Sequence, residues 1–265
     1  MNYPVLRKGD RGDRVGELQS ALGLKATKSF DNATEHAVKA FQVEANLVVD
    51  GIVGQHTWSA VLKTRIEAAN INPRSALLGS QRIDIDALIA SIPYPEVRES
   101  AQSSIPLILQ QCGDSGVTDL KQIAYILATA EHESHLGRWM EEFASGWDYE
   151  GREDLGNVNP GDGPLFKGRG FVQLTGRTNY DDWSKRIKLS LVEDPSLVSD
   201  PAIAAKILVE GMKLGTFTGY KLSDFIGDNF RSARRIINGM DCAERIAAIA
   251  QGYLDVLEKA NATKN

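Results

Sequence analysis

Cysteine is scarce in this sequence of 265 residues. The two cysteines, Cys112 and Cys242, lie far apart, and neither has a neighbour at the spacing of a metal or redox site. This scarcity excludes a disulfide framework and a Cys-x-x-Cys centre. We interpret both cysteines as buried apolar residues.

Long hydrophobic runs are missing as well. No segment approaches the roughly 18 consecutive apolar residues that cross a bilayer. The first residues, MNYPVLRKGDRGDRV, contain no apolar stretch typical of a signal peptide. We therefore expect synthesis in a cytoplasm, with any later export by another route.

The sequence also has no excess of positive charge, because its net charge is −5. This balance argues against nucleic acid as the main partner. Residues 1–65 carry nine Lys and Arg against seven Asp and Glu, whereas the remainder carries 21 against 28. A mildly basic N-terminal module favours an anionic polymer only weakly.

Apolar residues at helical spacing are the main pattern in the sequence. No series of alternating strands is evident, and neither is an internal repeat. The segment from 5 to 62 contains three helical patterns, around residues 15–22, 37–41 and 57–62. A glycine-rich turn at 50–54 separates the second pattern from the third. These patterns predict a small domain of three short helices.

The larger second segment is predicted to be mostly helical. Asp200 precedes Pro201 as an N-cap, and Asp241 to Glu244 has the pattern of a capping box. The chain is long enough for two domains. We predict a mainly α protein with a three-helix domain at 1–64, a linker at 65–82 and a larger helical domain at 83–265.

The stretch KQIAYILATAEHESH at 121–135 joins an apolar helical face to a group of carboxylates and imidazoles. Glu133 projects beside Ile126 at one edge of the apolar stripe. A carboxyl group at the rim of a core is partly desolvated, which suits a general acid. Glu131 lies at the other edge of the stripe, and the pattern alone does not choose between the two.

The segment that follows is rich in glycine, carboxylates and aromatic residues. Its aromatic side chains are interleaved with polar ones, which suits the binding of sugar rings. The Gly-Arg-Gly at 168–170 lacks the third glycine of a dinucleotide fingerprint. His132 and His135 are three residues apart and not in the HExxH pattern, so we expect neither a metal nor another cofactor.

Residues 5–62 resemble the three-helix peptidoglycan-binding domain of cell-wall hydrolases, most specifically in DGIVGQHTW. The resemblance implies a groove for the glycan or stem peptide of the wall. It nominates Asp50, Gly51, Gly54 and Trp58 as wall-binding residues. The alternative is that these residues serve only the fold, since aspartate and glycine usually shape turns.

ATAEHES, GRGFVQLTGRTNY and RIINGMD together resemble the family 19 glycoside hydrolases, the plant class I chitinase type, and more closely their phage endolysin branch. The resemblance implies that Glu133 is the general acid. It implies that Gln173 and Thr175 hold substrate and the attacking water. The other positions expected to bind substrate are His132, Arg169, Asn179, Tyr180 and Asn238.

The same resemblance places the second carboxylate at Glu142, nine positions after the acid, with Glu141, Glu150 and Asp154 as rivals. An unbroken helix would separate residues nine apart by about 13 Å along its axis and put them on opposite faces. An inverting pair lies about 6.5–9.5 Å apart across a cleft. The helix must therefore break between the two carboxylates, and we expect the break at Gly137.

These resemblances imply a monomeric endolysin that cuts the β-1,4 bond between N-acetylmuramic acid and N-acetylglucosamine in bacterial peptidoglycan. A holin-like lysis partner would give it access to the wall. Three alternatives stay open at this stage: a chitinase, a zinc-dependent peptidase of the stem peptide that uses His132 and His135, and a non-catalytic wall-binding protein.

Overall fold

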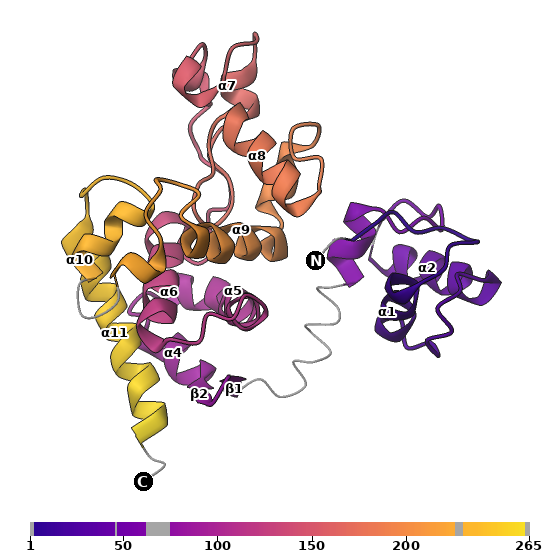
Figure 1. Cartoon of the computed structure of the whole chain (residues 1–265), viewed down its shortest axis with the longest axis horizontal. Coiled ribbons are helices and arrows are strands. Elements are labelled where there is room, and N and C mark those ends of the chain that lie inside the picture. Colours follow the sequence, from indigo (N-terminus) through magenta and orange to yellow (C-terminus); the bar gives the residue numbers. More distant parts are fainter. Residues whose placement is uncertain (1–2, 46, 62–74, 226–229, 263–265) are drawn as a thin grey trace. The chain divides into compact units, whose positions relative to one another are not determined.

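The structure is a computed structural model that describes residues 3–45, 47–61, 75–225 and 230–262. The protein is mainly α-helical, as predicted, and it forms two compact units that divide between Ile71 and Asn72 (Figure 1). Of the described helices, none is both long and apolar enough to cross a membrane.

The first unit contains α1 (Asp13–Ala21), α2 (Asn32–Glu44) and a helical segment that is described over residues 55–61. Asp31 caps α2 by accepting a hydrogen bond from the backbone N–H of Thr34. The buried apolar side chains of this unit form one small core: Leu6, Val15, Leu18, Phe30, Val38, Val53, Trp58 and Val61. The predicted small helical domain is therefore present.

Two buried glutamines show that the first unit contains an internal repeat. Gln19 bonds to groups that lie 8, 9, 10 and 15 positions later, ending at the Thr34 hydroxyl. Gln42 bonds to groups at the same four offsets, ending at the Thr57 hydroxyl. The residue nine positions later has a positive φ in both halves, 58° at Lys28 and 75° at Gly51.

This repeat corrects the expectation that the chain has none. The two halves share the buried glutamine, the buried threonine 15 positions later and the buried valine four positions earlier, Val15 and Val38. In each half one amide side chain satisfies backbone and hydroxyl groups inside a turn that would otherwise be buried without partners.

The second unit begins with a hairpin of β1 (Ser75–Leu78) and β2 (Gln81–Asp84), in which Ala76 pairs with Ile83. The Asn261 side chain of α11 (Ala243–Ala262) bonds to both the N–H and the C=O of Arg82. Residues 75–82 therefore belong to this unit, which corrects their assignment to the linker. The rest of the predicted linker, 65–74, lies outside the described residues.

The body of the second unit contains α4 (Ile85–Ser91), α5 (Pro95–Asp114), α6 (Leu120–Ser134), α9 (Pro201–Leu214) and α11. The other helical elements are η1 (Trp147–Tyr149), η2 (Glu153–Leu155), α7 (Asp162–Leu165), α8 (Arg177–Ile187), η3 (Pro195–Ser199), η4 (Leu222–Phe225), α10 (Phe230–Ala233) and η5 (Arg234–Ile236). Figure 1 shows the part with α7 and α8 projecting from this body.

The central helix is α6, which packs against α5, α9 and α11. All residues from Ile123 to Glu131 are buried. The sequence predicted an apolar stripe on one face, but neighbours cover every side of this segment. Asp119 caps its N-terminus through the N–H groups of Lys121 and Gln122. The residues after Glu131 therefore form the polar C-terminal end of a helix whose preceding part is buried in the core.

Two local predictions need correction. Cys112 is buried as expected, but Cys242 is exposed. Cys242 has φ 54° and immediately precedes α11, so the predicted capping box does not form. The two end residues of the predicted box pair with arginines instead: Glu244 with Arg231, and Asp241 with Arg234. The predicted N-cap at Asp200 is confirmed by hydrogen bonds from Ala202 and Ile203.

We predict that Gln42→Ala destabilises the first unit by about 2–4 kcal/mol, because several buried groups lose their partner together. Hydrogen exchange of the full chain, read over residues 32–44, measures this loss. Gln19→Ala should behave alike because of the repeat. Lys25→Ala, at an exposed position, is the control. Equal protection in Gln42→Ala and Lys25→Ala would contradict the role given to Gln42.

Candidate active site

The C-terminus of α6 turns the chain sharply directly after Glu133. The helix ends at Ser134, and the next three residues are left-handed, with φ 51° at His135, 52° at Leu136 and 89° at Gly137. The N–H of Leu136 bonds back to the carbonyl of Ala130 at 3.0 Å. The helix therefore breaks before Glu142, two residues earlier than expected, with Gly137 inside the turn.

Glu133 forms an ion pair with a buried arginine that the sequence analysis missed. Its Oε1 lies 2.5 Å from Nη1 of Arg234, whose side chain is only 3% exposed, whereas that of Glu133 is 18% exposed. Arg234 also bonds to the backbone carbonyl of Asp241 at 3.1 Å and lies 3.3 Å from its Oδ2. The only sequence signal for Arg234 is its position just before the Ile-Asn-Gly motif.

Glu131 and His132 have different surroundings. Glu131 is buried and accepts a hydrogen bond from the hydroxyl of Tyr253 on α11. Burial raises the pKa of Glu131 and lowers that of His132. Glu131 therefore faces the helical core, and Glu133 is the carboxylate of this helix end that is partly accessible to solvent.

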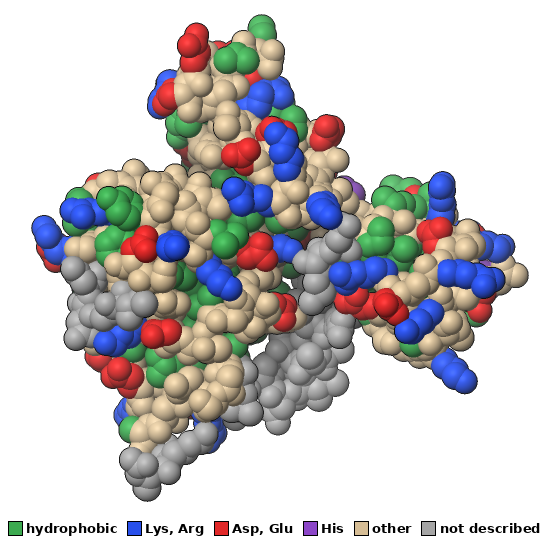
Figure 2. Space-filling model, viewed as in Figure 1, with side chains coloured by type: hydrophobic (Ala, Val, Ile, Leu, Met, Phe, Trp, Pro, Cys, Tyr) green, Lys and Arg blue, Asp and Glu red, His purple; other side chains and the backbone are tan. Residues whose placement is uncertain are grey.

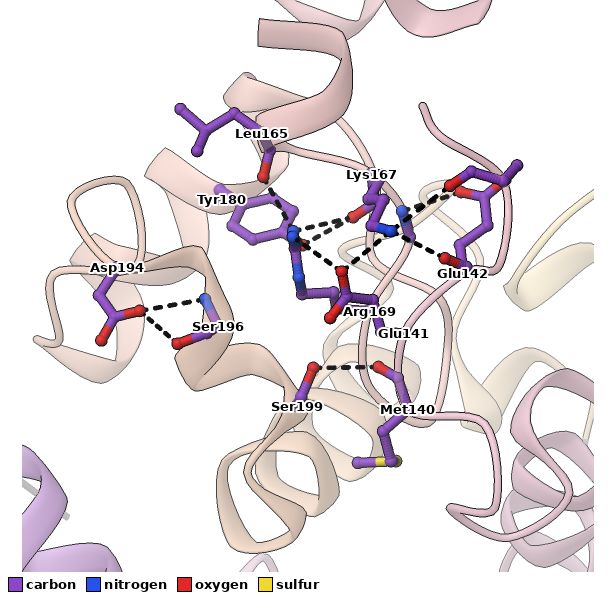
Figure 3. A network of polar contacts seen from close by, with 12 residues as sticks. Met140, Glu141, Glu142, Leu165, Lys167, Arg169, Tyr180, Asp194, Ser196 and Ser199 are labelled. Carbon is purple, nitrogen blue, oxygen red and sulfur yellow. Dashed lines mark hydrogen bonds and ion pairs between the residues drawn. The ribbon is translucent and has the colours of Figure 1, made fainter. Parts of the chain in front are cut away.

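Glu141 and Glu142 point in opposite directions because their segment is extended and pairs with Arg169 through an isolated bridge at Glu141. Glu141 forms ion pairs with Lys167 at 2.9 Å and Arg169 at 3.4 Å (Figure 3). The hydrogen bond from Lys167 lowers the pKa of Glu141. Glu142 accepts from two uncharged donors, the Tyr149 hydroxyl at 3.0 Å and the Gly168 N–H at 3.1 Å.

The other rival carboxylates are engaged within the projecting lobe, residues 144–166. Both oxygens of Glu150 accept backbone N–H groups, from Gly161 at 2.7 Å and Gly163 at 2.8 Å. Asp154 pairs with Arg152, which lowers the pKa of the aspartate. These contacts give Glu150 and Asp154 local structural roles.

Gly168 lies between Glu142 and Gln173. A Cβ at Gly168 would lie 2.8 Å from Oε1 of Gln173 and 3.1 Å from Oε2 of Glu142. The backbone carbonyl of Gln173 accepts from the Thr175 hydroxyl at 2.9 Å. Asn179 donates in turn to the carbonyl of Thr175 at 2.7 Å. Four residues nominated from sequence, Glu142, Gln173, Thr175 and Asn179, therefore form one connected cluster.

Arg169 and Tyr180 lie next to each other in the polar network that includes Glu141 and Lys167 (Figure 3). Tyr180 is fully buried, donates to the carbonyl of Lys167 at 2.8 Å and accepts from Arg169 at 3.1 Å. Burial raises the pKa of Tyr180 to about 12. Arg169 is 8% exposed and also bonds to the carbonyl of Leu165. Both side chains are buried in the fold, and their assignment to substrate binding stays a prediction.

Asn238 is exposed, and its backbone N–H bonds to the carbonyl of Arg234 at 3.1 Å. It therefore adjoins the Glu133–Arg234 pair. Three rings follow the end of α6 in series: the rings of His135 and Trp139 are tilted by 49° with centroids 3.9 Å apart, and Trp139 meets Phe143 edge-on at 5.7 Å. Phe143 is 82% exposed. Figure 2 shows hydrophobic and charged side chains mixed on the visible face of the second unit.

The residues nominated for wall binding lie inside the first unit or shape its turn. Trp58 is 2% exposed and donates to the carbonyl of Pro4. Asp50 accepts from Gln42 and from the N–H of Ile52. Gly51 is buried with φ 75°, and a Cβ there would lie 2.7 Å from Lys39. Trp58 thus lies in the core of the first unit, and its assignment to wall binding stays a prediction.

The peptidase alternative would require a metal at the two neighbouring histidines of the α6 end. Nδ1 of His132 and Nδ1 of His135 are both buried without a hydrogen bond within the described part of the chain. Over residues 3–45, 47–61, 75–225 and 230–262, no group of three or more His, Cys, Asp or Glu side chains is arranged to hold a metal ion.

Comparison with known proteins supports a peptidoglycan-binding and chitinase-like architecture. Residues 11–61 match the family model of a putative peptidoglycan binding domain. The chain is 29% identical over 153 residues to an endochitinase of Arabidopsis thaliana, a match that covers 56% of this chain and 51% of the relative. The chain thus spans about half the length of that relative.

Two solved structures were also found. Chitinase C of Streptomyces griseus HUT6037 is 20% identical, with 67% of each chain covered and a TM-score of 0.41. The endolysin of Burkholderia phage AP3 is 17% identical, with 97% of this chain and all of the other covered and a TM-score of 0.23.

The projecting lobe is tied to α8 by a buried ion pair. Asp162 is 1% exposed and accepts from Nε and Nη2 of Arg177 at 2.9 and 2.6 Å. The hydrogen bond from Arg177 is the main reason that the pKa of Asp162 is lowered to about 2. Arg177 also lies over the Phe166 ring at 4.5 Å.

We predict that Asp162→Asn destabilises the second unit at neutral pH by about 1.5–3 kcal/mol, through lost hydrogen bonds to a charged group. Because the folded pKa of Asp162 is lowered, its contribution is present above pH 4 and disappears as the pH falls through about 2. Urea unfolding of both proteins between pH 2 and 7 should show the difference shrinking on acidification. A difference that does not change with pH would refute this account.

Proposed function

We propose that this protein is an endolysin that hydrolyses the β-1,4 bond between N-acetylmuramic acid and N-acetylglucosamine in bacterial peptidoglycan. The observation that carries the proposal is the setting of Glu142. Among the described contacts, its carboxylate accepts hydrogen bonds only from uncharged donors, and it adjoins Gln173 across Gly168. The peptidoglycan-binding match and the similarity to an endochitinase support the wall glycan as substrate.

In this proposal Glu133 protonates the leaving oxygen, and Glu142 accepts a proton from the attacking water. Thr175 holds that water, because its hydroxyl proton is engaged by the carbonyl of Gln173 and its lone pairs can still accept. Attack from the face opposite the acid inverts the anomeric centre, with the two carboxyl groups about 6.5–9.5 Å apart.

Arg234 acts together with Glu133 as this proposed acid gains and donates its proton. The guanidinium holds Glu133 in one orientation in the free protein. When Glu133 carries the proton to be donated, its pairing with Arg234 weakens. Asp241 then provides Arg234 with a second carboxylate partner, which it already contacts at 3.3 Å. The buried arginine is thus never left without a counter-charge.

The first unit would hold the enzyme on the wall and raise the local concentration of bonds to be cut. The buried positions of Trp58 and Gly51 support a scaffold role for the DGIVGQHTW motif. Wall contacts would then come from exposed side chains of this unit.

Hydrolysis of chitin is the second candidate, favoured by the sequence similarity to the Arabidopsis endochitinase. Both substrates contain N-acetylglucosamine joined by β-1,4 bonds, so the same carboxylates would serve. The two functions differ in whether the site accepts the lactyl group of N-acetylmuramic acid.

We expect Glu133→Gln and Glu142→Gln each to lower the rate of wall lysis by at least about a hundredfold, since each removes a proton-transfer group. Glu141→Gln, adjacent but paired with Lys167, is the matched control and should keep most of the activity. Lysis of purified sacculi, with circular dichroism to monitor folding, tests the set. A well-folded Glu142→Gln protein with normal lysis would exclude Glu142 as the base.

Product analysis tests the bond and the stereochemistry together. Mass spectrometry of digested peptidoglycan should show fragments with N-acetylmuramic acid at the reducing end. NMR before mutarotation should show the α-anomer first, because inversion of a β-bond yields α. Fragments with N-acetylglucosamine at the reducing end would contradict the muramidase assignment, and an initial β-anomer would contradict inversion. Digestion of chitin alone would favour the chitinase.

A further inference from the structure

The Tyr149 phenol has a specific relation to Glu142. It donates to Oε1 of Glu142 at 3.0 Å, while the Gly168 N–H donates to Oε2 at 3.1 Å. Each carboxylate oxygen thus has one donor in a fixed direction. An ionised carboxylate offers about four acceptor sites, so this arrangement leaves sites free for a water.

The backbone around Tyr149 is held from both sides by buried polar groups. Asn157 is fully buried, donates to the carbonyl of Tyr149 at 2.9 Å and accepts from the N–H of Arg177 at 2.9 Å. The next residue, Glu150, is anchored by the N–H groups of Gly161 and Gly163. The phenol is therefore presented by a rigid frame.

The frame is also tightly packed, which limits its movement. A Cβ at Gly163 would lie 2.6 Å from the backbone nitrogen of Glu150, and one at Gly146 would lie 2.8 Å from the carbonyl oxygen of Gly163. Glycine is needed at both positions for the chain to approach itself this closely. The contacts of η1 and α7 thus define where the Tyr149 ring lies.

We propose that Tyr149 is a positioning residue that orients Glu142 toward the attacking water. The inference rests on the role of Glu142 proposed above. A carboxylate free to rotate would seldom direct a lone pair at the water, whereas one held at both oxygens keeps a single orientation.

Tyr149→Phe tests this role because it keeps the ring and removes only the hydroxyl. We expect kcat on soluble peptidoglycan fragments to fall about tenfold, the loss of one hydrogen bond to a charged group. KM should stay within about twofold, since the phenol does not contact substrate in this scheme. Tyr94→Phe, exposed on the α5 N-terminus, is the control and should behave as the wild type.

A double-mutant cycle separates action through Glu142 from a merely structural effect. If Tyr149 acts through Glu142, adding Tyr149→Phe to Glu142→Gln leaves the residual rate unchanged. A further tenfold loss in that background would overturn the inference. If Glu142→Gln is inactive and Tyr149→Phe is normal, only the positioning role fails. If Glu142→Gln is itself fully active, the proposed base fails and the inference with it.

Discussion

The pairing of the extended segment at Glu141 with Arg169 is the contact on which the candidate site depends. Side chains alternate along an extended chain, so fixing Glu141 against Lys167 and Arg169 turns Glu142 toward Tyr149 and Gly168. Arg169 also forms a β-bridge with Leu174, which brings the adjacent residues Gln173 and Thr175 next to the Glu142 segment. One bridged residue thus aligns three segments of the chain.

The two proposed catalytic carboxylates lie in settings that suit different tasks. Glu133 ends a buried helix and contacts a buried guanidinium, whereas Glu142 lies in an extended segment and contacts a phenol and a backbone amide. Pairs of titratable groups in contrasting environments are typical of acid–base sites. The lobe that carries Tyr149 is held together by internal polar contacts, among them the Asp162–Arg177 ion pair. A lobe built from short helical turns thereby holds Tyr149 in place.

The first unit shows how a sequence motif can serve the fold. Asp50 and Gly51 shape a turn around Gln42, and Trp58 fills the small core. Gln19 repeats the arrangement of Gln42 without an Asp-Gly pair nearby, which explains why the repeat is hidden in the sequence. A domain this small buries little apolar surface, so a few fully satisfied polar residues contribute much of its specificity.

The sequence by itself determined the helices, the N-cap at Asp200 and the need for a break after Glu133, because periodicity, capping and helix geometry are local properties. It did not determine whether Glu131 or Glu133 faces the core. Nor did it determine whether Glu141 or Glu142 pairs with the cations of Lys167 and Arg169. Those outcomes depend on partners distant in the chain: Arg234 lies 101 positions from Glu133, and Tyr253 lies 122 positions from Glu131. The burial of Arg169 and Tyr180 was likewise a tertiary outcome, since a polar side chain is covered only when distant segments pack over it.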